Sequence, residues 1–205
     1  MNDRLVLGIE SAIAGGSICI TSNGREVDSW VGNQSISKAE ELLPNIDRLM
    51  RENSISLKDF DRIIVSSGPG SFTGIKVGIS TVMGLRASTG MISLSISTLH
   101  ALSAILDDDL IAAIPVGRGT ICFQSFDKSQ PISEPKLVDQ AELIEISSDS
   151  RSKLVLHGSL FDRVRFPNAI DAGWNMASHL CSAVDSQFVS DDLRPLFVER
   201  KSSNI

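Results

Sequence analysis

Residues 63–89 read IIVSSGPGSFTGIKVGISTVMGLRAST, and this stretch decides the fold. The apolar run Ile63–Val65 predicts a buried strand, and the seven residues 67–73 predict a tight loop. Small and apolar residues then recur at roughly helical spacing over Thr73–Ser88. We therefore predict a strand, a glycine-rich loop and a helix.

The loop carries residues suited to a sharp turn. Pro69 fixes its own φ and favours extended geometry at Gly68, whereas Gly70 tolerates a positive φ. Ser71 or Thr73 can cap the helix that follows. The candidate structural loop comprises Gly68, Pro69, Gly70, Ser71, Phe72 and Thr73.

Three glycines, Gly74, Gly78 and Gly84, lie inside the predicted helix. Each costs about 1 kcal/mol relative to alanine, so something must offset that cost. Gly74 and Gly78 share a face with Thr81 and Leu85, and glycine allows another backbone to approach closely. That backbone belongs either to the chain's own sheet and helices or to a partner protein, and the sequence leaves both readings open.

The composition is that of a globular protein with one large domain or two small ones. The 205 residues are 42% apolar and 21% charged, and the formal charge of −6 gives no overall attraction to nucleic acid or an anionic membrane. Cys19, Cys122 and Cys181 lie too far apart for a zinc motif and read as buried small side chains. No run approaches the ~20 apolar residues of a membrane span, and no signal peptide is visible, so we expect a cytoplasmic protein.

The N-terminal region predicts a three-stranded meander. Leu5–Ile9, Ser17–Thr21 and Glu26–Val31 read as strands, and the dipeptide Asn23–Gly24 is a strong hairpin signal. Glu10 ends the first strand, where an acidic turn either holds phosphate or metal or simply belongs to the sheet.

An amphipathic helix is predicted over Ser37–Glu52. Ser37 and Glu40 form a capping box, and Pro44 is expected to bend or interrupt the helix. The apolar stripe comprises Ala39, Leu42, Leu43, Ile46, Leu49 and Met50.

The remaining elements alternate between strands and helices, which predicts a mixed sheet covered by helices and then a second unit. We place the boundary between residues 1–106 and 107–205. The predicted strands are Met91–Ser95, Leu110–Val116, Thr120–Phe126 and Lys153–His157, the predicted helices are Thr98–Leu106, Asp139–Ile146 and Ala172–Val184, and Leu193–Val198 is a final apolar segment.

No pattern predicts a catalytic, cofactor-binding or metal-binding residue. His100, His157 and His179 are scattered, and GPGSFTG matches neither the Walker nor the dinucleotide-binding pattern. Ser71 lacks both a histidine near it in sequence and the GxSxG elbow of a nucleophile. Clustered acids such as Asp107–Asp109 are typical of solvated turns.

The stretch Glu41–Leu102 closely resembles the TsaB family, also called YeaZ. The resemblance is carried by ELLPNIDRLM, by LKDFDRIIVSSGPGSFTGIKVGISTVMGLR and by ISTLHAL, while LGIESA and RPLFVER match the family's ends more loosely. It implies an α/β fold of the actin, Hsp70 and sugar-kinase ATPase (ASKHA) kind, with two lobes like ribonuclease H, the second abbreviated.

The resemblance also implies a function. Family members are non-catalytic scaffold and dimerisation subunits that dock TsaD, and in many bacteria TsaE, a partner ATPase. Together they support transfer of a threonylcarbamoyl group to adenosine 37 of certain tRNAs. For this chain it implies a TsaD-type partner, a homodimer in isolation, only indirect contact with tRNA, no membrane and no cofactor of its own, with a nucleotide at a complex interface left open.

The family's partner surface falls on its first two helices, here Ser37–Glu52 and Thr73–Ser88. The residues expected at this interface are Leu42, Ile46, Leu49, Gly74, Lys76, Val77, Gly78, Thr81 and Leu85.

The chain departs from the family pattern at three places. SISKA at Ser35–Ala39 lacks a histidine, Glu10 replaces a usual aspartate, and VGRGTICF, around Gly117–Cys122, looks shortened. Two alternatives therefore stay open: a stand-alone ATPase or metallopeptidase-like enzyme of the same superfold, and a homodimer with an unrelated binding role.

Overall fold

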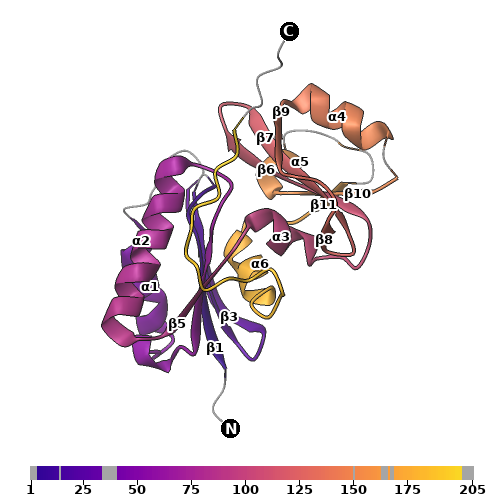
Figure 1. The fold of residues 1–205 in the computed structure, drawn as a ribbon. Coiled ribbons are helices and arrows are strands. Elements are labelled where there is room, and N and C mark those ends of the chain that lie inside the picture. Colours follow the sequence, from indigo (N-terminus) through magenta and orange to yellow (C-terminus); the bar gives the residue numbers. More distant parts are fainter. Residues whose placement is uncertain are drawn as a thin grey trace.

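The computed structural model describes residues 4–13, 15–33, 41–149, 151–162, 166 and 169–199, which include two β-sheets (Figure 1). The first sheet has the strand order β3-β2-β1-β4-β5. The first three strands pair antiparallel, and β4 and β5 then add in parallel beside β1. These strands are β1 (Leu5–Glu10), β2 (Ser17–Ser22), β3 (Arg25–Val31), β4 (Arg62–Ser66) and β5 (Ile92–Ile96).

The second sheet repeats this order, with two eight-residue strands, β6 and β7, and shorter strands beside them. Its central strand β6 pairs antiparallel with β7 and parallel with β10, while β8 and β9 pair with β7 and β11 pairs with β10. The strands are β6 (Leu110–Gly117), β7 (Thr120–Asp127), β8 (Gln130–Pro131), β9 (Lys136–Val138), β10 (Lys153–Leu156) and β11 (Ala169–Asp171). Two lobes of the same connectivity therefore make up the described chain.

Helices occupy equivalent places in the two lobes, and they differ most in length at α2 and α5. The 18-residue α2 follows the fourth strand of the first lobe, whereas the four-residue α5 follows the corresponding strand of the second. The helices are α1 (Leu42–Glu52), α2 (Phe72–Thr89), α3 (Thr98–Ser103), α4 (Gln140–Asp149), α5 (Gly158–Phe161) and α6 (Met176–Ser182), with a 3₁₀ turn η2 at Leu57–Asp59.

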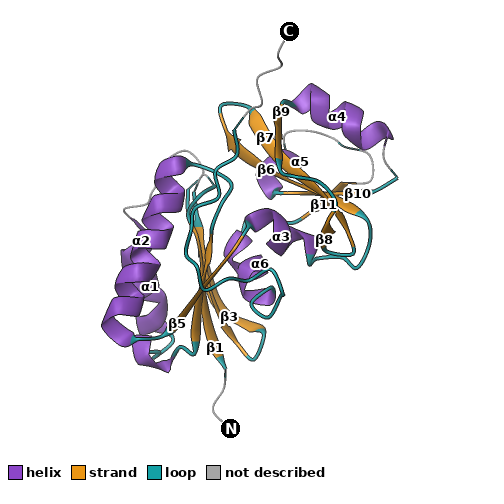
Figure 2. Ribbon diagram, in the orientation of Figure 1, coloured by secondary structure: helices purple, strands orange, loops and turns teal. Residues whose placement is uncertain are grey.

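Alternating side chains place helices on both faces of each sheet (Figure 2). In the first sheet, Leu7 and Ile9 pack under α1 and α2, while Val6 packs against α6 on the other face. In the second sheet, Ala112 faces α3, and Ala113 faces α5 and the buried side of α4. Helices α3 and α6 thus lie between the sheets.

The C-terminal residues return to the first lobe. The backbone N–H of Ala177 in α6 donates to the hydroxyl of Ser17 at 2.9 Å, and the N–H of Leu196 donates to the carbonyl of Ser67 at 2.7 Å. Ile13, from the first lobe, packs into the core below the second sheet. The division of the chain at residue 106 stays a prediction.

Most elements predicted from local patterns are confirmed, including the strand, loop and helix over residues 63–89. The expected disruption at Pro44 is wrong, because Pro44 lies in the first turn of α1, where its missing N–H costs no helical bond. Helix α6 starts at Met176 instead of Ala172, since Asn175 caps it by accepting from the N–H of Ser178. The predicted start of the first helix, with its capping box, lies outside the described residues, as do the departures at Ser35–Ala39.

The expectation for Gly68 is also wrong. Gly68 adopts φ +108° before a cis peptide bond to Pro69, instead of extended geometry. A side chain there would meet the carbonyl oxygen of Leu196 at 2.8 Å and the side chain of Ile75. The close approach of the C-terminal segment therefore requires glycine, a long-range cause that the local sequence does not show.

Candidate functional site

The glycine-rich loop docks onto the turn that follows β1. The N–H of Ser71 donates to the carbonyl of Ala12 at 2.7 Å, and the hydroxyl of Ser71 accepts from the N–H of Gly74 at 3.3 Å. Ser71, one of the two predicted caps, is therefore the N-cap of α2. On the other side of the loop, the N–H of Thr98 donates to the carbonyl of Gly68 at 2.9 Å. Both ends of the loop are thus fixed by backbone hydrogen bonds.

Glu10 holds the same turn from inside. Its side chain is 1% exposed, and one carboxyl oxygen accepts from the N–H groups of Ala12 at 2.5 Å and Ile13 at 3.0 Å. Burial raises the pKa of Glu10 to about 7, and the two backbone hydrogen bonds only partly oppose that rise. The carboxyl group is therefore engaged in shaping the turn that receives the loop.

The two first glycines of α2 pack against Ser11. The hydroxyl of Ser11 donates to the carbonyl of Gly74 at 2.8 Å, and a Cβ on Gly74 would collide with the carbonyl oxygen of Ser11. A Cβ on Gly78 would collide with the Ser11 hydroxyl. Of the two readings left open by the sequence, internal packing therefore explains Gly74 and Gly78. Gly84, by contrast, has open space beyond its Cα.

The residues expected at the partner interface differ in how far the structure exposes them. Leu42, Ile46 and Leu49 are buried in the chain's own core, as are Gly74 and Gly78. Three more are half-buried, and only Lys76 is exposed. The half-buried residues are Val77, Thr81 and Leu85. The interface itself stays a prediction, but a partner in contact with α1 and α2 would not reach the buried members of this set.

The exposed face of these two helices carries large apolar groups. Leu43 is 54% exposed at the start of α1, while Phe72 and Met83 of α2 are 56% and 55% exposed. Small residues separate them along α2. The exposed positions of α2 are Phe72, Thr73, Lys76, Ser80, Met83, Gly84, Arg86, Ala87 and Ser88. Sequence reasoning missed this face because apolar residues surround the whole of α2, so no stripe identifies its buried side.

The C-terminal segment braces the loop. The ring of Phe197 stacks on Phe72 with centroids 4.9 Å apart, and the ammonium group of Lys76 lies 3.9 Å from the Phe72 ring centre. Upstream, the hydroxyl of Ser95 donates to the carbonyl of Asp192 at 2.9 Å. Residues from both ends of the chain therefore hold the start of α2.

A cavity of about 670 Å³ opens between the loop and the β6–β7 turn. Residues 69–73 form one wall, while Gly117, Arg118 and Thr120 form another beside Phe197. Arg118 carries the one charge among the described residues that line it. This lining contains no carboxylate, the usual protein ligand of Mg²⁺.

The three histidines have separate environments. His157 is buried and accepts from the N–H of Ser159 at 3.1 Å through Nδ1, and burial lowers its pKa to about 4. His179 Nε2 lies 2.7 Å from the carbonyl of Ala172, and His100 packs between Phe126 and Phe188. In the part of the chain that the structure describes, no three His, Cys, Asp or Glu side chains gather into a metal site, and no helix has the length and apolarity of a membrane span.

Sequence comparison assigns the family. The sequence model of the family TsaD: tRNA N6-adenosine threonylcarbamoyltransferase matches residues 34–144, more than half of the chain. The chain is 24% identical over 157 residues to the tRNA threonylcarbamoyladenosine biosynthesis protein TsaB of Haemophilus influenzae, which covers 74% of this chain and 62% of that protein. This chain belongs to the TsaD family, in its TsaB (YeaZ) branch.

Other relatives share a smaller part of their length with this TsaB-family chain. The tRNA N6-adenosine threonylcarbamoyltransferase of Tropheryma whipplei strain Twist is 32% identical over 121 residues, which cover 51% of this chain and 30% of that protein. The chain thus spans less than two thirds of these curated relatives.

Solved structures confirm the fold. YeaZ from Pseudomonas aeruginosa superposes with a TM-score of 0.67 at 17% identity, covering 95% of this chain and all of that one. An inorganic polyphosphate/ATP-glucomannokinase from Arthrobacter sp. strain KM gives 0.54 at 10% identity, covering 89% and 98% of the two chains. The TsaB-family chain therefore has the predicted actin-like, sugar-kinase type of α/β fold.

Proposed function

We propose that this chain is a non-catalytic scaffold subunit in the biosynthesis of tRNA threonylcarbamoyladenosine. In this proposal it docks a TsaD-type subunit through the exposed face of α1 and α2. The observation that carries the proposal is the set of large apolar side chains, Leu43, Phe72 and Met83, that this face presents to solvent. Its family membership supplies the pathway and the class of partner.

Small residues on α2 would let a partner helix approach closely. Ser80, Gly84 and Ala87 are exposed beside Met83, and open space lies beyond Gly84. The TsaD family model matches residues 34–144 of this chain, a region that includes α1 and α2. A TsaD-type partner would therefore present a related helix pair, and two such pairs can pack as a four-helix bundle. A second copy of this chain would use the same face as a homodimer.

The roles of Glu10 and Ser71 in the fold support a subunit that catalyses no reaction of its own. The carboxyl group of Glu10 holds the turn, and the hydroxyl of Ser71 caps α2, so both groups serve the fold. In this proposal the TsaD-type subunit performs the transfer in the cytoplasm and contacts the tRNA. A TsaE-type ATPase joins the complex, and any nucleotide binds at a subunit boundary.

The test is size-exclusion chromatography with light scattering of the chain alone and mixed with the TsaD-type protein of the same genome. We expect a heterodimer that forms at the expense of homodimer. Gly84→Arg should abolish it without lowering the melting temperature, because the arginine extends into open space on the proposed face. Ser148→Arg on the exposed side of α4 is the matched control and should leave the heterodimer intact.

Two outcomes contradict the proposal. If the wild-type chain forms no complex with the TsaD-type protein, the partner is wrong. If Gly84→Arg and Ser148→Arg both leave the complex unchanged, the docking face is wrong. Gly78→Arg is unsuitable here, since its side chain would collide with Ser11 and disturb the fold.

A further inference from the structure

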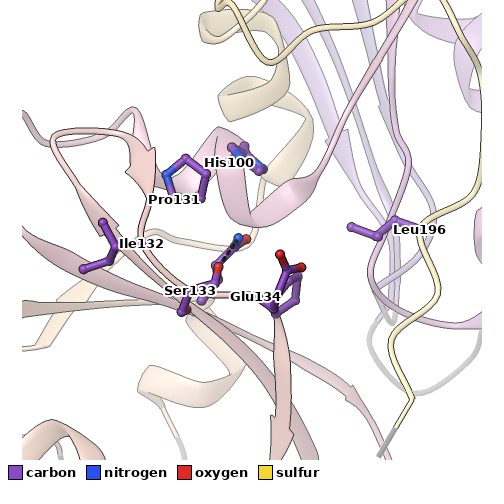
Figure 3. Close-up of a pocket in the computed structure, with 8 residues that line it drawn as sticks. His100, Pro131, Ile132, Ser133, Glu134 and Leu196 are labelled. Atoms are coloured by element: carbon purple, nitrogen blue, oxygen red, sulfur yellow. Dashed lines mark hydrogen bonds between the residues drawn. The ribbon is translucent and has the colours of Figure 1, made fainter.

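A second cavity, of about 570 Å³, lies between α3 and the segment that joins β8 to β9 (Figure 3). The side chains of His100 and Glu134 are directed into the same space. It is separate from the helix face described above. The described residues that line it are His100, Gln124, Pro131, Ile132, Ser133, Glu134, Pro135 and Leu196.

Two buried polar atoms in this lining lack a hydrogen-bond partner among the described residues. Gln124 is 4% exposed, and its Nε2 donates to the carbonyl of Ser133 at 2.8 Å, but its Oε1 has no donor. The Nε2 of His100 is likewise unpartnered. Buried polar groups are nearly always hydrogen-bonded, so a group bound in this cavity would satisfy two atoms that the protein leaves without a partner.

The orientation of the Gln124 amide is set by its neighbour. A backbone carbonyl only accepts, so the amide must direct its NH₂ group to Ser133 and keep Oε1 as the free end. Ser133 is itself held to β7, because its hydroxyl accepts from the N–H of Ser125 at 3.0 Å. This wall of the cavity is therefore anchored to the sheet.

The cavity offers acceptors and no cation. Gln124 Oε1 and the Glu134 carboxylate only accept, and burial lowers the pKa of His100, so its neutral ring keeps one nitrogen lone pair. No lysine or arginine is among the described residues that line the cavity. Prolines, Ile132 and Leu196 supply apolar walls.

We propose that this cavity binds a small organic cation whose ammonium or guanidinium group donates to Gln124, His100 and Glu134. An ammonium group carries three donors and no acceptor, which matches this set of acceptors. The apolar walls fit a short aliphatic stem, and the volume lies within the range of small-molecule sites. The two unpartnered atoms are closed to solvent in this structure, so in this proposal the Ser133 segment moves to let the ligand reach them.

The inference is tested by following the imidazole signals of His100 by NMR during titration with agmatine and with 1,5-diaminopentane. We expect saturable shifts with both cations and none with 1-pentanol, which has the stem without the charge. Gln124→Met, which keeps the volume and removes both the acceptor and the hydrogen bond to Ser133, should weaken binding about tenfold. Glu134→Gln should weaken it several-fold, and Glu145→Gln on α4 should leave it unchanged.

A lysine side chain of a docked protein would carry the same chemistry, so a blocked Gly-Lys-Gly peptide forms a further arm. Tighter binding of the free amines supports a small-molecule ligand, and tighter binding of the peptide overturns that assignment in favour of a protein side chain. Absence of any saturable shift in the wild-type protein overturns the site. Glu134 is exposed, so Glu134→Gln should leave the fold intact. Equal affinity of the cations for this variant and for the wild type would also overturn the site.

Discussion

Ser11 donates its hydroxyl to the carbonyl oxygen of Gly74 at 2.8 Å, and through this contact the turn after β1 lies directly against α2. The N–H of Ser71 donates to Ala12 one residue further along the same turn. The glycine-rich loop, the buried Glu10 and the start of α2 therefore form one packed unit. The outer face of α2 is left exposed.

We predict opposite effects for alanine at two glycines of α2. Gly74→Ala should lower the free energy of unfolding by about 2 kcal/mol, because overpacking against the Ser11 backbone exceeds the gain in helix propensity. Gly84→Ala should raise it by up to about 1 kcal/mol, since its Cβ enters open space. Urea denaturation of both variants measures these changes, and effects of the same sign would contradict the packing described for Ser11.

Gly74 packs inside the protein and Gly84 is exposed, and the sequence alone could not predict this difference. The strand, the Ser71 cap and the hairpin at Asn23–Gly24 follow from local signals, because caps and turns depend on neighbouring residues. Which glycine faces inward depends on Ser11, some sixty residues away in the chain, and α2 has no apolar stripe to indicate it. The residues expected at the interface therefore include several that the fold buries, and the interface itself stays a prediction.

Long-range contacts also explain the other differences. The predicted apolar segment Leu193–Val198 forms neither helix nor strand, and the N–H of Leu196 donates to the carbonyl of Ser67. Strands β9 and β11 have three residues each, too few for an alternating pattern to appear. The cavity of Gln124 and His100 depends on residues from three elements and has no sequence signal.

We predict that Glu10 makes the protein less stable as the pH rises. Its pKa is about 7 in the fold against 4.5 ordinarily, so the folded state holds the proton more tightly. The stabilisation is complete below pH 4.5 and is lost as the pH rises through 7, by roughly 3 kcal/mol. Glu10→Gln, which keeps an acceptor for Ala12 and Ile13, should remove this loss. Urea denaturation between pH 4.5 and pH 8 measures it, and an unchanged slope in the variant would contradict the buried carboxyl group.

His157 should have the opposite effect over almost the same range. Burial lowers its pKa to about 4 from 6.5, so the folded state holds the proton less tightly, and stability is lost as the pH falls through this window. Asparagine can also cap α5, so His157→Asn should keep the helix and remove this dependence. The free energy of unfolding of the wild type then combines two opposed pH dependences. The Glu10→Gln variant should become more stable with rising pH, the His157→Asn variant less stable, and the double variant nearly flat in the same urea series.

The stacked pair Phe72 and Phe197 should control how firmly the C-terminal segment is held. Phe197→Ala removes a ring contact of about 0.5–1.5 kcal/mol, so the N–H of Leu196, bonded to Ser67, should exchange with solvent several-fold faster. The global melting temperature should change little, because Phe197 lies outside the core clusters and is 45% exposed. Phe161→Ala, an exposed phenylalanine on α5, is the matched control and should leave the exchange at Leu196 unchanged. Hydrogen exchange measured by NMR resolves this amide. Equal exchange in wild type and Phe197→Ala would mean that the backbone hydrogen bond holds the segment without the rings.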